Sequence, residues 1–257
     1  MKERILGYFQ RKREKKNQYK AEMAKLGPMR RVWIEWIKPV GTVVITLTIV
    51  RSAFADWNDV PTGSMKPTIL EGDRIYVNKV AYGLRAPLTM RWIARWDTPD
   101  RSDIVVCFSP EDGTRLVKRV VGIPGDTLEI RQGLVYVNGT RCNYEPVDQT
   151  DADALLEGIE HADIRFVQEE TLKDAEPHAV MHFTKPGKFA ARDFAPVVVP
   201  ERQYFLMGDN RDESGDSRSF GFVKESKIVG RSGAIAFSVD PENYYLPRWG
   251  RFLKSLP

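Results

Sequence analysis

The sequence has few histidines and cysteines, with three His and two Cys among 257 residues. The histidines (His161, His178 and His182) all lie in one weakly patterned stretch. This distribution argues against a Ser-His-Asp triad, which needs a histidine held beside its serine. Two cysteines exclude a dense disulfide framework. Cys107 and Cys142 could form one bridge in an oxidising compartment or stay unlinked thiols, and their spacing decides neither.

The sequence also lacks a long uninterrupted apolar run, an internal repeat and a low-complexity tract. Its most apolar segment is uncharged only from residue 39 to residue 50, shorter than the roughly 20 residues of a bilayer span. A span over residues 39–57 must therefore include Arg51, whose charge has to reach the headgroups. Three tryptophans bracket the segment as an interfacial belt: Trp33, Trp36 and Trp57. The pattern favours a single transmembrane anchor over a peripheral or buried helix.

The formal net charge of +4 is unevenly distributed. Residues 1–38 contain 12 Lys/Arg and 4 Asp/Glu, a net of +8, whereas the remaining residues contain 27 Lys/Arg and 31 Asp/Glu, a net of −4. Because Lys and Arg flank membrane segments on the cytoplasmic side, residues 1–38 are interpreted as a basic cytoplasmic extension rather than a nucleic-acid arm. The chain from about Trp57 onward is then expected to face outward. The basic region is too long for a cleavable signal peptide.

Short strand-like runs with Gly, Pro and Asn turns fill most of the remaining sequence. The runs are 74–79, 103–108, 115–121, 127–131, 134–137, 197–199 and 204–207, with a hairpin turn at Asn138-Gly139. This pattern predicts a mainly β fold. Residues 58–147 and 196–240 are expected to form one β domain, with the acidic residues 148–195 as a smaller inserted subregion. Residues 241–257 alternate aromatic and cationic side chains and are expected to form an amphipathic tail.

Three further blocks follow the apolar segment in order: residues 61–68 (PTGSMKPT), 115–126 (RLVKRVVGIPGD) and 208–218 (GDNRDESGDSR). Proline and glycine constrain the turn that holds Ser64, which makes this serine a candidate nucleophile near the bilayer surface. Together with 72–79 (GDRIYVNK) and 228–236 (IVGRSGAIA), the blocks closely resemble bacterial type I signal peptidase, a membrane protease with a Ser/Lys dyad. The resemblance spans roughly residues 50–240, excluding the region near 148–195.

The resemblance implies a membrane-bound serine endopeptidase that removes N-terminal signal peptides from exported preproteins after small-x-small motifs. By position, Ser64 matches the family nucleophile and Lys118 the general base, while the Ser64 amide and the Thr62 hydroxyl match the oxyanion hole. In the family, the position of Ser214 orients the lysine, and that of Gly208 leaves room for Lys118. The positions of Asp216 and Arg218 form a structural ion pair. The position of Met65 lies near the substrate.

The chemistry requires a base close to Ser64, because a serine hydroxyl is weakly nucleophilic until its proton is removed. A lysine with a pKa near 10.4 is neutral in only about one molecule in 2,500 at pH 7. Burial lowers a lysine pKa by about 3–5 units, enough to reverse that ratio. Apolar residues flank Lys118 in sequence, and Arg119 must point away from it. Without the three blocks, an exposed strand lysine is the simpler interpretation; with them, the general base is favoured.

Other chemistries fit the sequence less well. Lys66 follows Ser64 by two residues, whereas Ser-x-x-Lys enzymes use three, and Pro67 follows it; we expect it to be solvent-exposed. The 208–218 loop lacks the spacing and final Glu of a calcium-binding EF-hand. His178 and His182 have the i, i+4 spacing of zinc ligands on a helix but lack a third ligand. Cys107 has no activating base evident in sequence. No metal and no cofactor are expected.

The expected partners are preproteins with signal peptides and membrane lipid, without nucleic acid, at the bacterial cytoplasmic (inner) membrane. Proximity to the secretion translocon stays open, as does contact of the tail with lipid headgroups rather than with the domain. A conjugation-system maturation peptidase is the nearest alternative enzyme. An inactive membrane-anchored binding or chaperone module is the alternative of another class. The joint presence of Ser64, Lys118, Thr62 and Ser214 argues against it.

Overall fold

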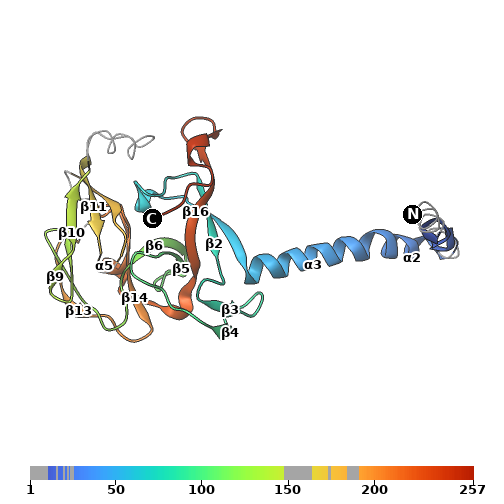
Figure 1. Cartoon of the computed structure of the whole chain (residues 1–257), viewed down its shortest axis with the longest axis horizontal. Coiled ribbons are helices and arrows are strands. Elements are labelled where there is room, and N and C mark those ends of the chain that lie inside the picture. Colours follow the sequence, from blue (N-terminus) through green and yellow to red (C-terminus); the bar gives the residue numbers. More distant parts are fainter. Residues whose placement is uncertain are drawn as a thin grey trace, which may run out of the picture. The chain divides into compact units, whose positions relative to one another are not determined.

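The computed structural model describes residues 11–15, 17–19, 21, 23, 26–147, 164–172, 175–183 and 191–257 (Figure 1). The chain divides into two compact units, Met1–Val50 and Arg51–Pro257. All strands of the described residues belong to the second unit, which also holds the candidate site.

A continuous helix occupies Pro28–Ala53 and is, among the described residues, the one helix long and apolar enough to cross a membrane. It consists of α2 (Pro28–Val32), a π-helical stretch at Trp33–Ile37 and α3 (Lys38–Ala53). Proline at its start has the fixed φ that suits a first helical position. The helix begins before the expected anchor, residues 39–57, and ends before Trp57. Residues 55–59 are outside the helix and pair with a neighbouring strand.

An eight-stranded antiparallel sheet forms the centre of the second unit. Its order is β1 (Ala55–Asp59), β2 (Asp73–Asn78), β16 (Ile228–Asp240), β5 (Ile104–Phe108), β6 (Arg115–Gly122), β14 (Gln203–Met207) and β15 (Val223–Lys224), with β17 (Leu246–Pro247) paired to β16. The short helix α5 (Ser217–Phe220) follows β14 in the chain. The strands lie close to the predicted runs, so the mainly β prediction is confirmed.

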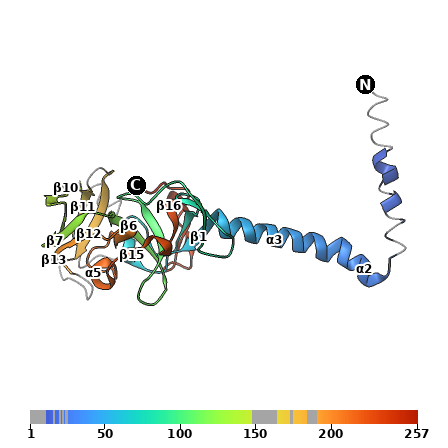
Figure 2. The same ribbon diagram turned by 90° about the horizontal axis from the view of Figure 1, so that it is seen from below.

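Three smaller sheets complete the unit. One has the order β13 (Phe194–Val198), β7 (Thr127–Arg131), β8 (Leu134–Val137) and β9 (Thr140–Arg141). Another joins β10 (Asn143–Pro146), β11 (Ile164–Thr171) and β12 (His178–Phe183), and the third is the hairpin of β3 (Gly83–Arg85) and β4 (Trp92–Arg95). Figures 1 and 2 show β10, β11 and β13 gathered at one end of this unit and β16 at the other. Asn138 and Gly139 adopt the positive φ expected at the β8–β9 turn.

The region expected to be an insertion, 148–195, is not separate from the sheets around it. Its strand β11 pairs with β10, which precedes residue 148, and with β12 on its other edge. β13, which begins at Phe194, pairs with β7. Weak patterning of the segment concealed β11 and β12 from sequence-based prediction, although they pair with each other. Residues 148–163, which include His161, lie outside the described residues.

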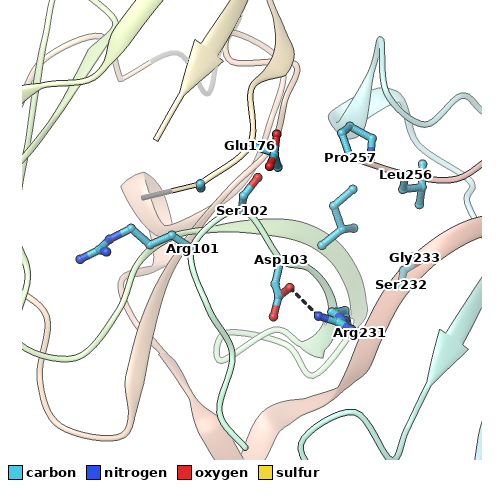
Figure 3. Close-up of a pocket in the computed structure, with 11 residues that line it drawn as sticks. Arg101, Ser102, Asp103, Glu176, Arg231, Ser232, Gly233, Leu256 and Pro257 are labelled. Atoms are coloured by element: carbon cyan, nitrogen blue, oxygen red, sulfur yellow. Dashed lines mark hydrogen bonds and ion pairs between the residues drawn. The ribbon is translucent and has the colours of Figure 1, made fainter. Parts of the chain in front are cut away.

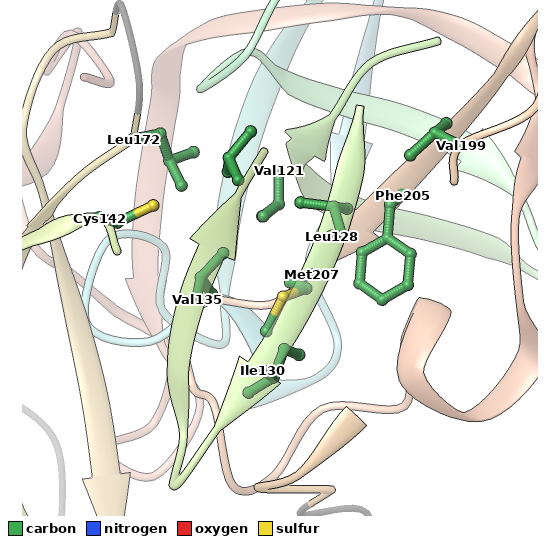
Figure 4. Packing of buried hydrophobic residues seen from close by; sticks show 10 residues of the cluster. Val121, Leu128, Ile130, Val135, Cys142, Leu172, Val199, Phe205 and Met207 are labelled. Atoms are coloured by element: carbon green, nitrogen blue, oxygen red, sulfur yellow. The ribbon is translucent and has the colours of Figure 1, made fainter. Parts of the chain in front are cut away.

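Buried apolar side chains hold the sheets together in separate clusters. Figure 4 shows the cluster in which Val121 and Phe205 of the central sheet meet Leu128 and Val135 of the β7–β8 hairpin. Cys142 belongs to this cluster, whereas Cys107 belongs to another and is a free thiol. The two cysteines therefore do not form a disulfide. Burial raises the pKa of the Cys107 thiol to about 12, which makes it a poor nucleophile.

The C-terminal residues pack against the rest of the second unit, to which they belong. Arg251 donates to both carboxylate oxygens of the buried Asp73, and Arg248 donates to the backbone carbonyl of Glu71. The Leu256 side chain packs on the apolar cluster next to β2 and β6. Packing on the domain is thus present, while Tyr244 and Trp249 stay mostly exposed.

Candidate active site

Ser64 lies in a short 3₁₀ turn, Gly63–Met65, which follows Thr62 in an extended conformation. Met65 is completely buried in the cluster that contains Val60 and Ile69, and its carbonyl accepts a hydrogen bond from the Ile69 amide at 2.9 Å. Burial of the Met65 side chain in this cluster holds the Gly63–Met65 turn in place. The neighbouring Ser64 side chain, only partly buried, stays accessible.

Lys118 reaches this serine from β6. Its Nζ donates to Ser64 Oγ at 2.5 Å, although the two residues are 54 positions apart in sequence. Successive strand residues point to opposite faces, so Lys118 and Arg119 face away from each other, as expected. The register that pairs Lys118 with Val105 of β5 sets the position of the lysine along the sheet.

The surroundings of Lys118 disfavour its charged form. The residue is 2% exposed, and this burial lowers its pKa below the ordinary lysine value. The carboxylates of Asp216 and Asp209 act in the opposite direction, while Arg218 adds to the lowering. Desolvation is the largest of these influences, so the site shifts Lys118 toward its neutral form.

Gly208 brings the 208–218 loop against the serine turn. A Cβ at this position would lie 2.3 Å from Ser214 Oγ and 2.3 Å from the backbone oxygen of Ser64. A side chain at position 208 would therefore clash with Ser214 and Ser64. The sequence had led us to expect that glycine is needed there to leave room for Lys118. Ser214 is buried beside Gly208, and Lys118 donates to Ser64 rather than to the Ser214 hydroxyl.

Asp216 and Arg218 form a buried ion pair, with Nη2 to Oδ2 at 2.8 Å. Asp216 also accepts from the Gly208 amide at 3.1 Å and caps α5 by accepting from the Arg218 amide. Burial alone would raise the pKa of Asp216, but the charge and hydrogen bonds of Arg218 keep it below the ordinary value. A permanent carboxylate therefore holds the loop at Gly208.

Four neighbouring residues were not assigned to the site from the sequence: Thr68, Arg119, Asp209 and Asn210. Asp209 and Arg119 form a fully buried bidentate pair, and Thr68 donates to Asp209 at 2.6 Å. Asn210 donates its amide N–H to the Ser64 carbonyl at 3.1 Å and its side-chain Nδ2 to the Gly63 carbonyl at 3.2 Å. Asn210 thus ties the loop to the serine turn. Its place in the 208–218 block, two residues after Gly208, was the sequence signal for Asn210.

The β11–β12 region supports the same loop from the other side. The Met181 amide donates to the Asp209 carbonyl and the Arg211 amide donates to the Met181 carbonyl, both at 2.9 Å. Arg211 also pairs with Glu170 of β11, with both side chains buried. Asn210 therefore sits between a bridge to β12 and the two carbonyls of the serine turn.

The remaining candidate residues have simpler surroundings. Thr62 is exposed next to the serine turn. Lys66, expected to be exposed, is instead partly buried and pairs with Glu71 at 3.3 Å. His178 and His182 lie on a strand rather than a helix, beside Glu170 and Asp212, and burial lowers the pKa of both, that of His182 to about 4. Within the described residues, no cluster of metal-ligating side chains is found.

A cavity of about 630 Å³ lies beside Ser102 and Pro257 (Figure 3). Its lining includes Asp103 and Arg231, which pair at 3.4 Å, together with Ser102 and Pro257. Arg119 donates to the backbone oxygens of Ser102 and Pro257 behind it. Neither Ser64 nor Lys118 lines this cavity, so it is not the place where a substrate would meet the two residues.

A serine hydroxyl in contact with a buried amine is the chemistry of a serine hydrolase. Residues 33–237 match the family described as signal peptidase, peptidase S26. The chain is 33% identical to signal peptidase I of Pseudomonas aeruginosa over 233 residues, covering 85% of this chain and 78% of that protein. It is 31% identical to signal peptidase I of Buchnera aphidicola over 232 residues, covering 77% and 73%.

Among solved structures, a signal peptidase I from Enterococcus faecalis V583 is 29% identical, with a TM-score of 0.31, covering 52% of this chain and 97% of that one. On the match to the family and to its curated members, the chain belongs to the signal peptidase family, peptidase S26. It is therefore a serine endopeptidase, and the resemblance inferred from the sequence blocks is confirmed.

Proposed function

We propose that the protein is membrane-bound and removes N-terminal signal peptides from exported preproteins after small-x-small motifs, with Ser64 as nucleophile and neutral Lys118 as general base. One observation carries this proposal: Lys118 Nζ lies 2.5 Å from Ser64 Oγ in surroundings where the lysine is 2% exposed. A base within hydrogen-bond distance and with a lowered pKa meets both requirements of general-base catalysis.

In the proposed reaction, Ser64 Oγ attacks the scissile carbonyl while its proton passes to Lys118 Nζ. The Ser64 amide and the Thr62 hydroxyl stabilise the oxyanion. Lys118 then returns the proton to the leaving amine, which leaves an acyl-enzyme on Ser64. Water, deprotonated by Lys118, attacks this ester. Lys118 then returns the proton to Ser64 Oγ as the bond to the signal peptide breaks, which restores the neutral lysine and the serine hydroxyl. No cofactor takes part.

The precursor is proposed to bind as an added strand. On one edge, β6 pairs with β5 from Arg115 to Arg119, while on its other edge β14 pairs only from Arg119 to Gly122. The backbone of 115–118 therefore has an edge not covered by β14, beside the serine turn. An extended peptide could hydrogen-bond along it.

Small side chains before the cleaved bond fit the apolar surface under this edge. Met65, Val60 and Val117 are buried in one cluster next to Ser64. Because they already fill the space beneath the proposed peptide, little room is left for a large side chain. Met65, expected from the sequence to lie near the substrate, is completely buried, so we propose that it shapes this surface from inside the cluster.

The location proposed for this activity is the outer face of the cytoplasmic membrane. The candidate span Pro28–Ala53 and the +8 charge of residues 1–38 support a cytoplasmic N-terminus and an outward-facing catalytic unit. Signal peptides are themselves membrane-inserted, so an anchored enzyme meets them at the surface.

The test is cleavage of a radiolabelled secretory precursor by the purified full-length protein in detergent. Wild type should cleave after a small-x-small motif, and both Ser64→Ala and Lys118→Ala should abolish cleavage. Lys224→Ala, which removes an exposed strand lysine, and Ser226→Ala, which removes an exposed serine, are the matched controls and should cleave normally.

If wild type leaves ordinary precursors intact, general signal-peptide removal is wrong and a dedicated substrate takes its place. If Lys66→Ala abolishes cleavage while Lys118→Ala does not, the base has been misassigned.

A further inference from the structure

A second cavity, of about 310 Å³, lies between the β3–β4 hairpin and the last residues of α3. Ser52 and Ala53, where the candidate span ends, are part of its lining. The other apolar lining residues include Leu88, Met90 and Phe108, and the cationic ones are Lys79, Arg85 and Arg115. The cavity thus combines an apolar wall with three positive side chains.

Arg85 is the unusual member of this set. The residue is only 5% exposed, yet no described carboxylate forms an ion pair with it, and its Nε has no hydrogen-bond partner. Its guanidinium stacks on Trp92 at 3.9 Å and contacts Met90 Sδ and the Val229 carbonyl. Glu225, the acid whose charge acts on Arg85, forms ion pairs with Arg95 and Arg202 instead.

Burial lowers the pKa of Arg85 to about 10, so it still carries its charge at neutral pH. A buried cation without a counterion is unfavourable unless something else supplies the negative charge. The other two cations share one carboxylate: Asp56 lies 3.2 Å from Lys79 and 3.7 Å from Arg115. The cavity therefore has an excess of positive charge centred on Arg85.

We propose that this cavity binds an anionic membrane phospholipid, with its phosphate on Arg85 and the start of its acyl chains against Leu88 and Phe108. The inference rests on the membrane anchoring proposed above, but not on peptidase activity. Because Ser52 and Ala53 end the candidate span, the cavity is placed at the depth of the headgroups. Guanidinium groups form strong charge-assisted hydrogen bonds with phosphate.

A precursor side chain is the competing occupant. Arg115 begins the edge of β6 proposed to bind the peptide, and it donates to Asn58 at 3.0 Å. An acidic precursor residue could reach Arg115 there. The lipid is favoured because the buried, unpaired charge belongs to Arg85, on the hairpin beside the end of α3, rather than to Arg115.

The experiment is thermal unfolding of the full-length protein in neutral detergent without any precursor. Phosphatidylglycerol added to the micelles should raise the Tm saturably, whereas phosphatidylcholine and inorganic phosphate should not. Arg85→Gln should weaken the apparent affinity for phosphatidylglycerol about tenfold or more. Arg91→Gln removes an exposed arginine from the same hairpin connection and should leave the shift unchanged.

A second pair of variants leaves Arg85 in place. Leu88 is 75% exposed at the cavity rim, so substitutions there should not disturb folding. Leu88→Glu should reduce the phosphatidylglycerol shift by repelling the phosphate, and Leu88→Gln should reduce it much less. This pair decides the outcome if Arg85→Gln fails to fold.

Four results would overturn the proposal. They are an equal shift with phosphatidylcholine, a full shift with inorganic phosphate alone, an unchanged shift in both Arg85→Gln and Leu88→Glu, and no shift in wild type. A separate unfolding series tests a soluble acidic precursor peptide without phosphatidylglycerol. A Tm shift caused by this peptide, and lost in Arg85→Gln, would assign the cavity to the substrate. Cleavage is not measured, so failure here leaves the proposed peptidase reaction untouched.

Discussion

Lys118 is buried where its charged form is poorly solvated, and this has a measurable effect on stability. Its folded pKa lies below the value near 10.4 of an exposed lysine. Between these two values the unfolded chain binds more protons than the folded chain, so stability rises with pH across that window. Lys118→Met removes the titration. We expect the variant to be more stable than wild type at neutral pH, with the difference shrinking toward about pH 10.

Thermal unfolding of both proteins over this pH range checks the prediction. Lys224→Met, at an exposed lysine, serves as the control and should show no such trend. A stability difference between Lys118→Met and wild type that stays constant with pH would contradict a depressed lysine pKa.

Gly208 illustrates a second effect of a single residue. Gly208→Ala places a Cβ 2.3 Å from the Ser64 backbone oxygen, which cannot move without shifting the serine turn. We expect kcat for precursor cleavage to fall at least about 100-fold, because displacement of a reacting group by about 1 Å has that effect. Gly215→Ala is the matched control: its Cβ would meet no atom within 4 Å, and activity should persist. Equal activity of the two variants would show that the contact at Gly208 is relaxed in solution.

At the scale of elements, β11 and β12 serve as a support for the 208–218 loop. The buried Arg211–Glu170 pair joins the loop to β11, and the Tyr144 hydroxyl of β10 donates to the same Glu170. Arg211→Met leaves Glu170 buried without a counterion. The expected loss is about 3–5 kcal/mol of unfolding free energy, measured by denaturant unfolding.

An exposed pair provides the comparison for this prediction. Arg131 and Glu129 form an ion pair on β7, with the Arg131 side chain largely in solvent. Arg131→Met should change stability by about 0–1 kcal/mol. If Arg211→Met changes stability no more than Arg131→Met does, the strands do not hold the loop.

At the scale of the whole molecule, the proposed topology can be read by chemical labelling. Cys107 and Cys142 are buried, so wild type should react little with a membrane-impermeant maleimide. Tyr244→Cys places a thiol at a position 93% exposed, and intact cells should label it. Glu14→Cys lies in the basic extension and should be labelled only after permeabilisation. Labelling of Glu14→Cys in intact cells, without Tyr244→Cys, would reverse the proposed orientation.

The sequence by itself determined the family and most strands of the central sheet, but not β11 and β12. Alternating apolar residues and Gly/Asn turns predicted the strands around Lys118, because side-chain periodicity is a local property. The apolar segment after a basic stretch predicted the helix. The helix of the structure, Pro28–Ala53, ends before Trp57, since residues 55–59 pair with β2. Ser64 and Lys118 were found through motifs whose order along the chain is visible without a fold.

Only the tertiary structure decided which distant groups meet. The Ser64–Lys118 contact depends on the β5–β6 register, and the bond of Asn210 to the serine turn joins residues 147 positions apart. The same holds for Arg85, which is buried and has no ion pair with a carboxylate among the described residues, a property of its neighbours in space. Burial, which lowers the pKa of Lys118, is likewise created by several strands together. A local pattern cannot encode these features, because desolvation and ion pairing are set by every chain segment that packs around a group.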